Sequence, residues 1–229
     1  MKRIDLSHIL PASKKGLFEI SHFTLTEDEV KMERIRDAMN RRAETMGLEA
    51  GVKYTRLTHV HRGIIMSNTP MEIVTNDKIM RLAHGNVLIA GLGLGMVVLE
   101  ISKKVDVEGI IVVEKEQEVI DLVGPHVLKH TACPIIIEHR DIFKFKEHAR
   151  SYFDSIYDTI YFDIWDDIGA DNWEEMKILK RMYRSLLYEG GKAWMGCWRE
   201  ETMANMARDE RATERIHRSI IEHRRSAAL

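Results

Sequence analysis

Three short apolar segments of this chain each end at an acidic side chain. The acids are Glu114, Asp141 and Asp163, and Asp166 follows the last of them by three residues. If the segments are parallel strands, their carboxyl ends meet at one edge of a sheet, where ligands collect. A carboxylate at that edge can accept hydrogen bonds from ribose hydroxyl groups or take a proton from a reacting group. The acids therefore predict a binding or catalytic site there.

A glycine-rich turn precedes these acids. The apolar segment Val87–Ala90 runs into Gly91, Gly93 and Gly95 and continues as a helical pattern. Alternating glycines allow positive φ angles and let a ligand approach the backbone, and the helix start offers unpaired N–H groups. The dinucleotide fingerprint needs glycine at its first, third and sixth positions, but Met96 stands at the sixth. The turn predicts a nucleotide-like ligand outside the standard NAD pattern, and a helix–strand packing turn without a ligand is the alternative.

Two segments resemble motifs of a known family. The Gly-x-Gly-x-Gly turn resembles motif I of class I S-adenosylmethionine-dependent methyltransferases, and Ile89 is more like the spermidine-synthase-like branch. The segment Tyr157–Asp167 resembles motif IV of the same enzymes. Within it, the spacing of Asp163 and Asp166 resembles the aspartate pair of spermidine synthases. The resemblance covers roughly residues 63–198 and is specific for the cofactor half.

The sequence also departs from the spermidine synthase pattern. Leu94 stands where those enzymes favour aspartate, and Asp167 replaces their proline. Their tyrosine-histidine-glutamate segment has no counterpart between Met66 and Glu72. These departures weaken the assignment to polyamine synthesis more than the assignment of the cofactor.

The resemblance implies S-adenosyl-L-methionine as the cofactor. It assigns cofactor binding to Gly91, Gly93, Gly95, Glu114, Asp141 and Asp163. Glu114 would accept from the ribose and Asp141 from the adenine amino group, while a turn or helix cap is an equal interpretation of Asp141. The implied catalytic residues are Asp163, as the base, and Asp166, whose counterpart holds the amine in spermidine synthases. Trp165, just beyond the strand, is expected in the substrate pocket.

The expected function is methyl transfer to a small-molecule acceptor, and two other functions stay open. One is a spermidine-synthase-like aminopropyltransferase that uses decarboxylated S-adenosylmethionine, which Asp163 and Asp166 favour. The other is a noncatalytic S-adenosylmethionine-binding subunit. His59-x-His61 lacks the further ligands of a zinc site, so no metal is expected.

Alternation of strand and helix patterns predicts an α/β fold with a doubly wound, mostly parallel Rossmann-like sheet. The expected strands are Val87–Ala90, Ile110–Val113, Ile135–Ile137, Thr159–Phe162 and Lys192–Cys197. Helices are expected after the first, second and fourth strands, the last of them capped by Asp171 with Glu174 in its first turn. A charged helical pattern follows Trp198 in place of a final antiparallel strand pair, which favours a truncated C-terminal edge. Residues 67–229 form this domain, and residues 1–66 form a small α+β appendage.

The appendage has its own signals. A strand is expected at Leu17–Phe23, and Thr26 with Glu29 forms a capping box that starts a helix. A hairpin is expected from Val52 to Met66. One helix is then expected from Pro70 to Leu82, since proline suits a first helical position.

Composition narrows the class of protein. The 229 residues are 45% hydrophobic and 31% charged, which is ordinary for a globular protein, and no apolar run is long enough to span a bilayer. The start of the chain lacks the apolar core of a secretion signal, and Cys133 and Cys197 are too few for a disulfide framework. A cytoplasmic location without membrane contact is therefore expected. A net charge of −2 disfavours nucleic acid as a partner and leaves a homodimer open.

Overall fold

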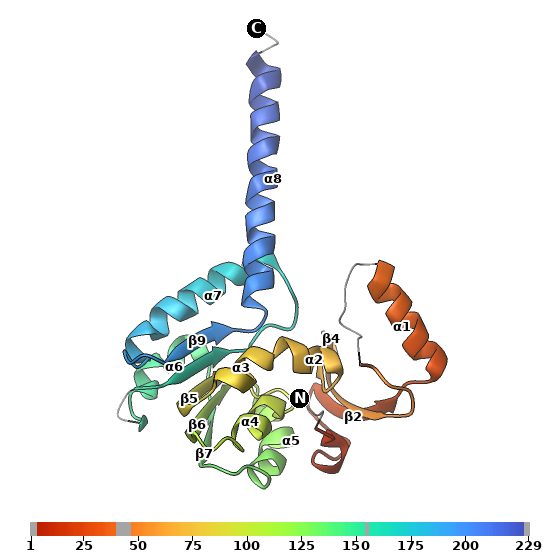
Figure 1. Ribbon diagram of the computed structural model, residues 1–229, viewed down its shortest axis with the longest axis vertical. Helices are drawn as coiled ribbons and strands as arrows, with labels where there is room; N and C mark the ends of the chain where they lie inside the picture. Colours follow the sequence, from red (N-terminus) through yellow and green to blue (C-terminus); the bar gives the residue numbers. More distant parts are fainter. Residues whose placement is uncertain (1–3, 40–46, 154–155, 227–229) are drawn as a thin grey trace.

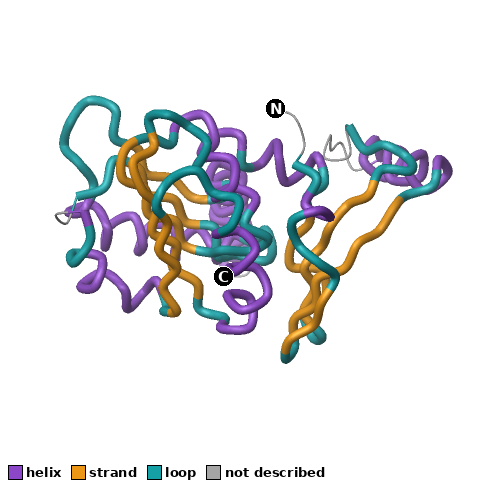
Figure 2. Tube along the Cα trace, turned by 90° about the horizontal axis from the view of Figure 1, so that it is seen from below, coloured by secondary structure: helices purple, strands orange, loops and turns teal. Residues whose placement is uncertain are grey.

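The computed structural model describes residues 4–39, 47–153 and 156–226, and these residues form two sheets (Figure 1). The first is antiparallel with the order β1-β2-β3-β4, and the second has the order β7-β6-β5-β8-β9. Figure 2 shows their strands as two separate groups. Buried side chains of both, such as Phe18 from the first and Leu88 from the second, belong to one hydrophobic core. The division into two domains stays a prediction, because the sheets share that core.

The second sheet carries the predicted α/β architecture. Its strands are β5 (Gly85–Ala90), β6 (Val107–Glu114), β7 (Ile135–His139), β8 (Thr159–Phe162) and β9 (Trp194–Cys197). All four neighbouring pairs are parallel. β8 is buried at every position, as expected for a strand covered on both faces. The prediction of a doubly wound Rossmann-like sheet is confirmed, and every pairing within the described sheet is parallel.

Helices cover both faces of this sheet (Figure 1). They are α4 (Met96–Ile101), α5 (Gln117–Leu128), α6 (Ile142–Ala149) and α7 (Ala170–Tyr183). Helix α6 was not expected from the sequence, because Ile142, Phe143 and Phe145 obscure its period. The helix buries Ile142, Phe145 and Ala149. The expected cap of α7 is also wrong. Gly169 occupies the N-cap position, and Asp171 lies within the first turn.

The antiparallel sheet packs beside the parallel one. Its strands are β1 (Ser13–Lys15), β2 (Phe18–Thr24), β3 (Lys53–His59) and β4 (Gly63–Ser67), and a short 3-10 helix, η1 (Leu6–His8), precedes them. Helix α1 (Glu27–Met39) is inserted between β2 and β3. The predicted capping box is confirmed, since the Thr26 backbone N–H donates to Glu29 at 2.8 Å and the Glu29 N–H donates to the Thr26 hydroxyl at 3.2 Å.

The helix expected from Pro70 to Leu82 is instead two helices, α2 (Pro70–Thr75) and α3 (Asp77–Leu82). Asn76 breaks them with φ −99° and ψ 3°. Its side chain donates to the Glu72 carbonyl at 3.0 Å and accepts from the Tyr161 hydroxyl at 2.8 Å. A side chain that satisfies the backbone at the break makes the interruption inexpensive. The bond from Tyr161 also ties the break to β8.

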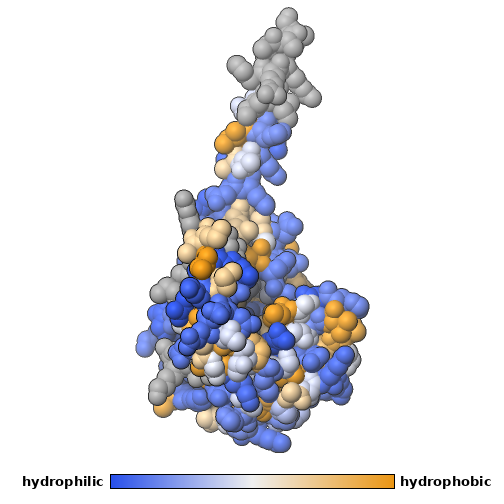
Figure 3. Space-filling view, turned by 90° about the vertical axis from the view of Figure 1, so that its right-hand side faces the viewer, coloured by the Kyte–Doolittle hydropathy of each residue, from blue (hydrophilic) through white to orange (hydrophobic). Residues whose placement is uncertain are grey.

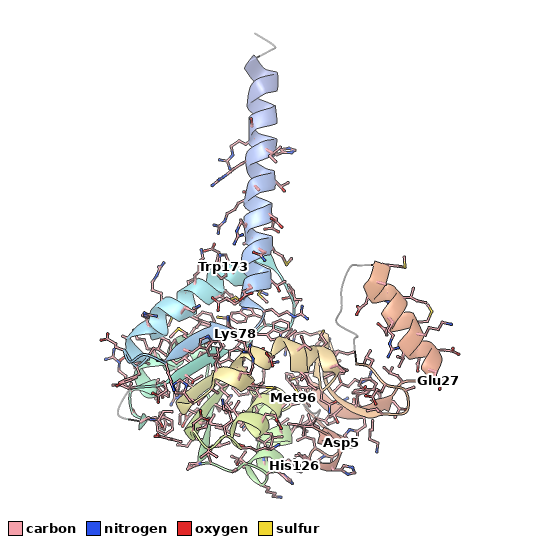
Figure 4. All side chains as sticks on the ribbon, in the orientation of Figure 1. Asp5, Glu27, Lys78, Met96, His126 and Trp173 are labelled. Carbon is pink, nitrogen blue, oxygen red and sulfur yellow. The ribbon has the colours of Figure 1, made fainter. Side chains whose placement is uncertain are left out.

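The last helix, α8 (Glu200–Ser226), leaves the body of the molecule. Its first turns pack beside α7, where Met203 and Ala207 are buried. A short 3-10 helix, η3 (Arg184–Leu186), follows α7. Figure 4 shows Trp173 of α7 near this junction. Beyond it, α8 rises alone (Figure 1). Of the helices in the described residues, none combines the length and the apolar character needed to cross a bilayer.

Candidate active site

A cavity of about 470 Å³ opens at the carboxyl ends of the parallel strands. The central strand β5 lies between β6 and β8, so the chain leaves β5 toward one side and returns on the other. Open α/β sheets bind ligands at such a reversal, because the loops part there. The volume lies within the range of small-molecule pockets. β4 of the antiparallel sheet supplies a further wall.

The glycine turn forms the floor of this cavity, but its three glycines serve different purposes. All three have positive φ, +97° at Gly91, +51° at Gly93 and +71° at Gly95. A Cβ on Gly91 would collide with the Asp163 carbonyl, and one on Gly93 would collide with the Met66 sulfur. Both positions line the cavity.

Gly95 differs from the other two. It is the N-cap of α4, and a Cβ there would collide with Val127 of α5. It is not among the residues that line the cavity. Gly95 is therefore required for packing against α5 and Gly91 for the close approach to the Asp163 backbone, while Gly91 and Gly93 also line the cavity.

Met66 covers part of the turn. Its sulfur lies 3.0 Å from the Leu94 backbone nitrogen, which donates to it. A thioether is a weak acceptor, so a stronger one could take its place at low cost. The Leu94 N–H is therefore a donor available to a ligand that displaces the flexible Met66 side chain.

Glu114 is buried where β6 ends and is joined to the glycine turn. One carboxylate oxygen accepts from the Leu92 N–H at 2.8 Å and the other from the Glu116 N–H at 2.9 Å. Burial raises the pKa of Glu114, and the backbone hydrogen bonds partly oppose that rise. Each oxygen keeps a further lone pair. The carboxylate is thus held in one orientation and can still accept from two hydroxyl groups.

Asp163 stands at the end of β8, on the opposite side of β5. Its backbone N–H donates to the Ala90 carbonyl at 2.8 Å, which continues the sheet into the cavity. Burial, and next the charge of Glu72, raise the pKa of Asp163 well above its usual range. Glu72 of α2 is only 6% exposed and also lines the cavity. Two acids thus face one small space.

Asp141 lines the cavity and also caps α6. Its carboxylate accepts from the Phe143 N–H at 2.9 Å. Phe143 lies beside it in the cavity wall. The structure therefore shows the capping interpretation directly. The binding interpretation stays a prediction.

Asp166 is engaged by the antiparallel sheet. The Arg62 guanidinium, in the turn between β3 and β4, lies 2.6 Å from the Asp166 carboxylate and 3.6 Å from that of Glu116. It also lies 5.5 Å from the centre of the Phe18 ring. Arg62 thereby bridges the loops that follow β6 and β8 and offsets the charge of Asp166 at the mouth of the cavity.

Two indoles form the wall near Asp163. Trp165 donates to Glu175 at 2.9 Å, and Trp198 donates to the Thr75 hydroxyl at 3.2 Å. Both rings line the cavity. Their hydrogen bonds fix the polar edges, so the ring faces are left for an apolar or cationic ligand.

The structure thus brings the predicted site residues Gly91, Gly93, Glu114, Asp141, Asp163, Trp165 and Asp166 to one cavity and leaves Gly95 outside its lining. Arg62, Met66 and Glu72 also line the cavity, and the sequence did not predict them as site residues. The signal for Glu72 was an acid in the first turn after Pro70. Arg62 lies 104 residues from Asp166, and no local pattern pairs them.

These residues fit S-adenosylmethionine. The accessible backbone at Gly93 and the Leu94 N–H suit its amino-acid part, and the oriented Glu114 carboxylate suits its ribose. Phe143 beside Asp141 offers an apolar surface for an adenine. Among the described residues, no group of three or more histidine, cysteine or acidic side chains is arranged to hold a metal ion.

No protein-family model matches this sequence, and a search of curated proteins finds no match. Solved structures to which the chain is similar include an S-adenosylmethionine-dependent methyltransferase from Agrobacterium tumefaciens. The TM-score is 0.46 and the identity 17%, over 66% of this chain and 50% of that one. Another similar structure is the O-methyltransferase TomG from Streptomyces achromogenes, in complex with S-adenosylmethionine. Its TM-score is 0.40 and its identity 9%, over 74% of this chain and 65% of that one.

A third similar structure is the spermidine synthase from Thermotoga maritima. Its TM-score is 0.37 and its identity 19%, over 61% of this chain and 50% of that one. The chain spans less than two thirds of the length of each of these three structures.

Proposed function

We propose that this chain is a class I S-adenosylmethionine-dependent methyltransferase that acts on a small-molecule acceptor. One observation carries the proposal: the Leu92 N–H donates a hydrogen bond to the Glu114 carboxylate at 2.8 Å, and both residues line the same cavity. The acid that ends β6 is thereby fixed to the glycine turn that follows β5. A carboxylate and accessible backbone N–H groups, joined in this way, suit a nucleoside that carries a charged amino-acid tail.

The two sides of the cavity have different tasks in this proposal. Glu114 accepts hydrogen bonds from the ribose, and the wall formed by Asp141 and Phe143 takes the adenine. The amino-acid part lies on the backbone at Gly91 and Gly93. The acceptor enters on the side of Asp163, where the two indoles confine it.

The bound cofactor supplies an electrophilic methyl group on a sulfonium. The protein aligns the acceptor with that group and removes the acceptor's proton if it carries one. Asp163 is suited to the proton transfer because its raised pKa makes it a stronger base than an exposed aspartate. Tyr161, whose hydroxyl is tied to Asn76, lines the same end of the cavity and limits the water near this carboxylate.

Two observations weigh against the other functions. An aminopropyltransferase would need Asp166 for a cationic amine, but Arg62 pairs with that carboxylate at 2.6 Å. A noncatalytic subunit would need no base, whereas Asp163 combines a raised pKa with a place in the cavity wall, as catalytic groups do. Methyl transfer is the function that agrees with both.

Calorimetric titration of the purified chain with S-adenosylmethionine, its demethylated product and decarboxylated S-adenosylmethionine tests the proposal. The first two should bind, and the third should bind more weakly. Gly93→Val should abolish binding, because a β-branched side chain is strained at φ +51° and fills the space above the turn.

Gly191→Val is the matched control, since a Cβ at Gly191 meets nothing within 4 Å and its φ is not positive. It should bind as the wild type does. A folded wild-type chain that binds neither S-adenosylmethionine nor its product would refute the proposal. Preference for the decarboxylated compound would favour aminopropyl transfer instead.

A further inference from the structure

The hairpin formed by β3 and β4 has a fixed base and an exposed tip. At the base, the buried Asn68 side chain accepts from the Thr55 N–H at 2.7 Å and donates to the Ile4 carbonyl at 2.9 Å. Every residue of the tip, from Val60 to Ile64, is exposed. Helix α8 does not lie over the hairpin, since it rises clear of the body (Figure 3). A segment with few buried contacts at one end is able to open locally about the other.

The turn at the tip has a preorganised shape. The His59 Nδ1 atom accepts from the backbone N–H groups of His61 and Arg62, at 3.2 Å each. The His59 ring packs edge-on against Phe18, with 4.9 Å between the ring centres. Gly63 follows with φ +79°, which lets the chain reverse. The backbone that carries the Arg62 side chain therefore moves with the hairpin as one unit.

Arg62 ties this tip across the mouth of the cavity. Its guanidinium pairs with Asp166 at 2.6 Å and with Glu116 at 3.6 Å, on the loops that follow β8 and β6. All three residues line the cavity, and β5 lies between those two strands. The bridge therefore joins the loops on both sides of the glycine turn. Because exposed ion pairs contribute little stability, it can open and re-form without unfolding of the domain.

Met66, on β4 of the same hairpin, covers the glycine turn from within. Its sulfur accepts from the Leu94 N–H at 3.0 Å and fills the space that a Cβ on Gly93 would need. A β-bulge at Ile65 shifts the register of β4 immediately before Met66, and bulges of this kind redirect side chains beside active sites. A ligand that uses the Leu94 N–H has to displace the Met66 side chain.

We propose that the β3–β4 hairpin is a lid on the cavity. Met66 holds the Leu94 N–H until the amino-acid part of the ligand takes its place, and the Arg62 bridge then closes the mouth over the bound ligand. The closed bridge slows the exit of the ligand. The identity of that ligand rests on the proposed function, whereas the motion of the hairpin does not.

A purely structural role for Arg62 is the competing explanation, in which it clamps the antiparallel sheet to the body. That sheet has other anchors. Phe18 and Leu57 belong to the core that the two sheets share, and Lys15 of β1 pairs with Asp121 of α5 at 2.5 Å. The sheet is therefore held without the tip, and the position of the Arg62 bridge at the mouth favours a role in ligand exchange.

Hydrogen exchange of the chain without added ligand measures the motion itself. In Arg62→Ala, the amides of Gly93 and Leu94 should exchange about two- to fivefold faster, the range expected for loss of an exposed ion pair. Arg56→Ala is the matched control, since Arg56 lies in β3, donates to Ser21 at 3.0 Å and is outside the cavity lining. It should exchange as the wild type does. Equal exchange in Arg62→Ala and the wild type would overturn the lid.

Ligand exit gives a second measurement. Dissociation of the demethylated product of S-adenosylmethionine can be followed by stopped-flow tryptophan fluorescence. Arg62→Ala and Asp166→Asn should each raise the dissociation rate about two- to fivefold. The double variant should raise it no further, because both substitutions remove the same bridge. Met66→Ala should instead raise the association rate, because the Leu94 N–H is then already accessible.

The outcomes separate the lid from the proposed function. A wild type that binds neither S-adenosylmethionine nor its product would refute the proposed function, and hydrogen exchange would still decide whether the hairpin is a lid. Product binding with the same dissociation rate in the wild type, Arg62→Ala and Asp166→Asn would overturn the lid and leave the proposed function standing. Fully additive effects in the double variant would overturn the bridge as the element that closes the mouth.

Discussion

The acids at the ends of β6 and β8 share one cavity, and burial raises the pKa of both, but their neighbours differ. Glu114 accepts from two backbone N–H groups, which partly oppose the rise in its pKa and fix its orientation. Asp163 lies near Glu72, whose like charge adds to burial in raising its pKa. In the proposed function, this difference separates the binding residue Glu114 from the base Asp163 within one site. A carboxylate held by donors is a good ligand for hydroxyl groups, and one crowded by a second acid is a good base.

The largest effect should come from removing the base. Asp163→Asn keeps the shape of the side chain and should lower the single-turnover rate by about 10² to 10⁴, the usual contribution of a general base. Cofactor affinity should stay within a few-fold. Rates with acceptors found by screening small nucleophiles, together with calorimetry, measure the two quantities.

Asp167→Asn, at the exposed acid four residues later, serves as the control and should keep full activity. The substitution at Asp163 should also raise the free energy of unfolding at neutral pH, because it removes a charge that the fold disfavours. A rate equal to the wild type would show that another group, or none, takes the proton. Parallel loss of rate and binding would make Asp163 a binding residue.

Glu114 should show the opposite pattern. Glu114→Ala is expected to weaken S-adenosylmethionine binding by about 1.5 to 3 kcal/mol, the scale of hydrogen bonds to a charged group. That is roughly a 10- to 150-fold rise in the dissociation constant. Turnover at saturating cofactor should change less than affinity does.

Glu108→Ala, on an exposed position of the same strand, is the matched control for calorimetry. If Glu114→Ala is folded and binds like the wild type, the ribose lies elsewhere. In that case the contrast between the two acids loses its functional meaning.

The sequence predicts the acids and glycines of the cavity better than it predicts the neighbours that change the charge around Asp163 and Asp166. The glycine turn and the apolar strands that end near Glu114 and Asp163, further along the chain, are local signals, and the parallel sheet brings them to one edge. Glu72 and Arg62 come from segments with other local patterns, a proline-started helix and a hairpin turn. Their contribution depends on how α2 and the antiparallel sheet pack against the strand ends. Periodicity carries no information on such packing.

The glycines show the same limit at smaller scale. Their spacing predicts a tight turn, and the positive φ angles agree. Only packing separates Gly93, which faces Met66 at the cavity, from Gly95, which faces Val127 of α5. A pattern of identical residues thus concealed two physical reasons for glycine.

The smallest and most specific effect concerns the pairing of Glu72 with Asp163. The base must be deprotonated, so the rate should fall as pH drops through the raised pKa of Asp163. Glu72→Gln removes a negative charge while keeping the size of the side chain, and the pKa of Asp163 should therefore fall. The acid limb of the kcat/KM profile should move to lower pH with little change in its plateau.

Stability gives an independent measure of the same coupling. An acid whose folded pKa lies above its ordinary 3.8 stabilises the fold below that value, and this stability is lost as pH rises to the folded pKa. Urea unfolding from pH 4 to 8 should therefore show a smaller loss in Glu72→Gln than in the wild type. Glu175→Gln, at an acid that instead accepts from Trp165, is the control and should keep the wild-type slope. An acid limb that stays in place, with an unchanged slope of stability, would mean that burial alone sets the basicity of Asp163.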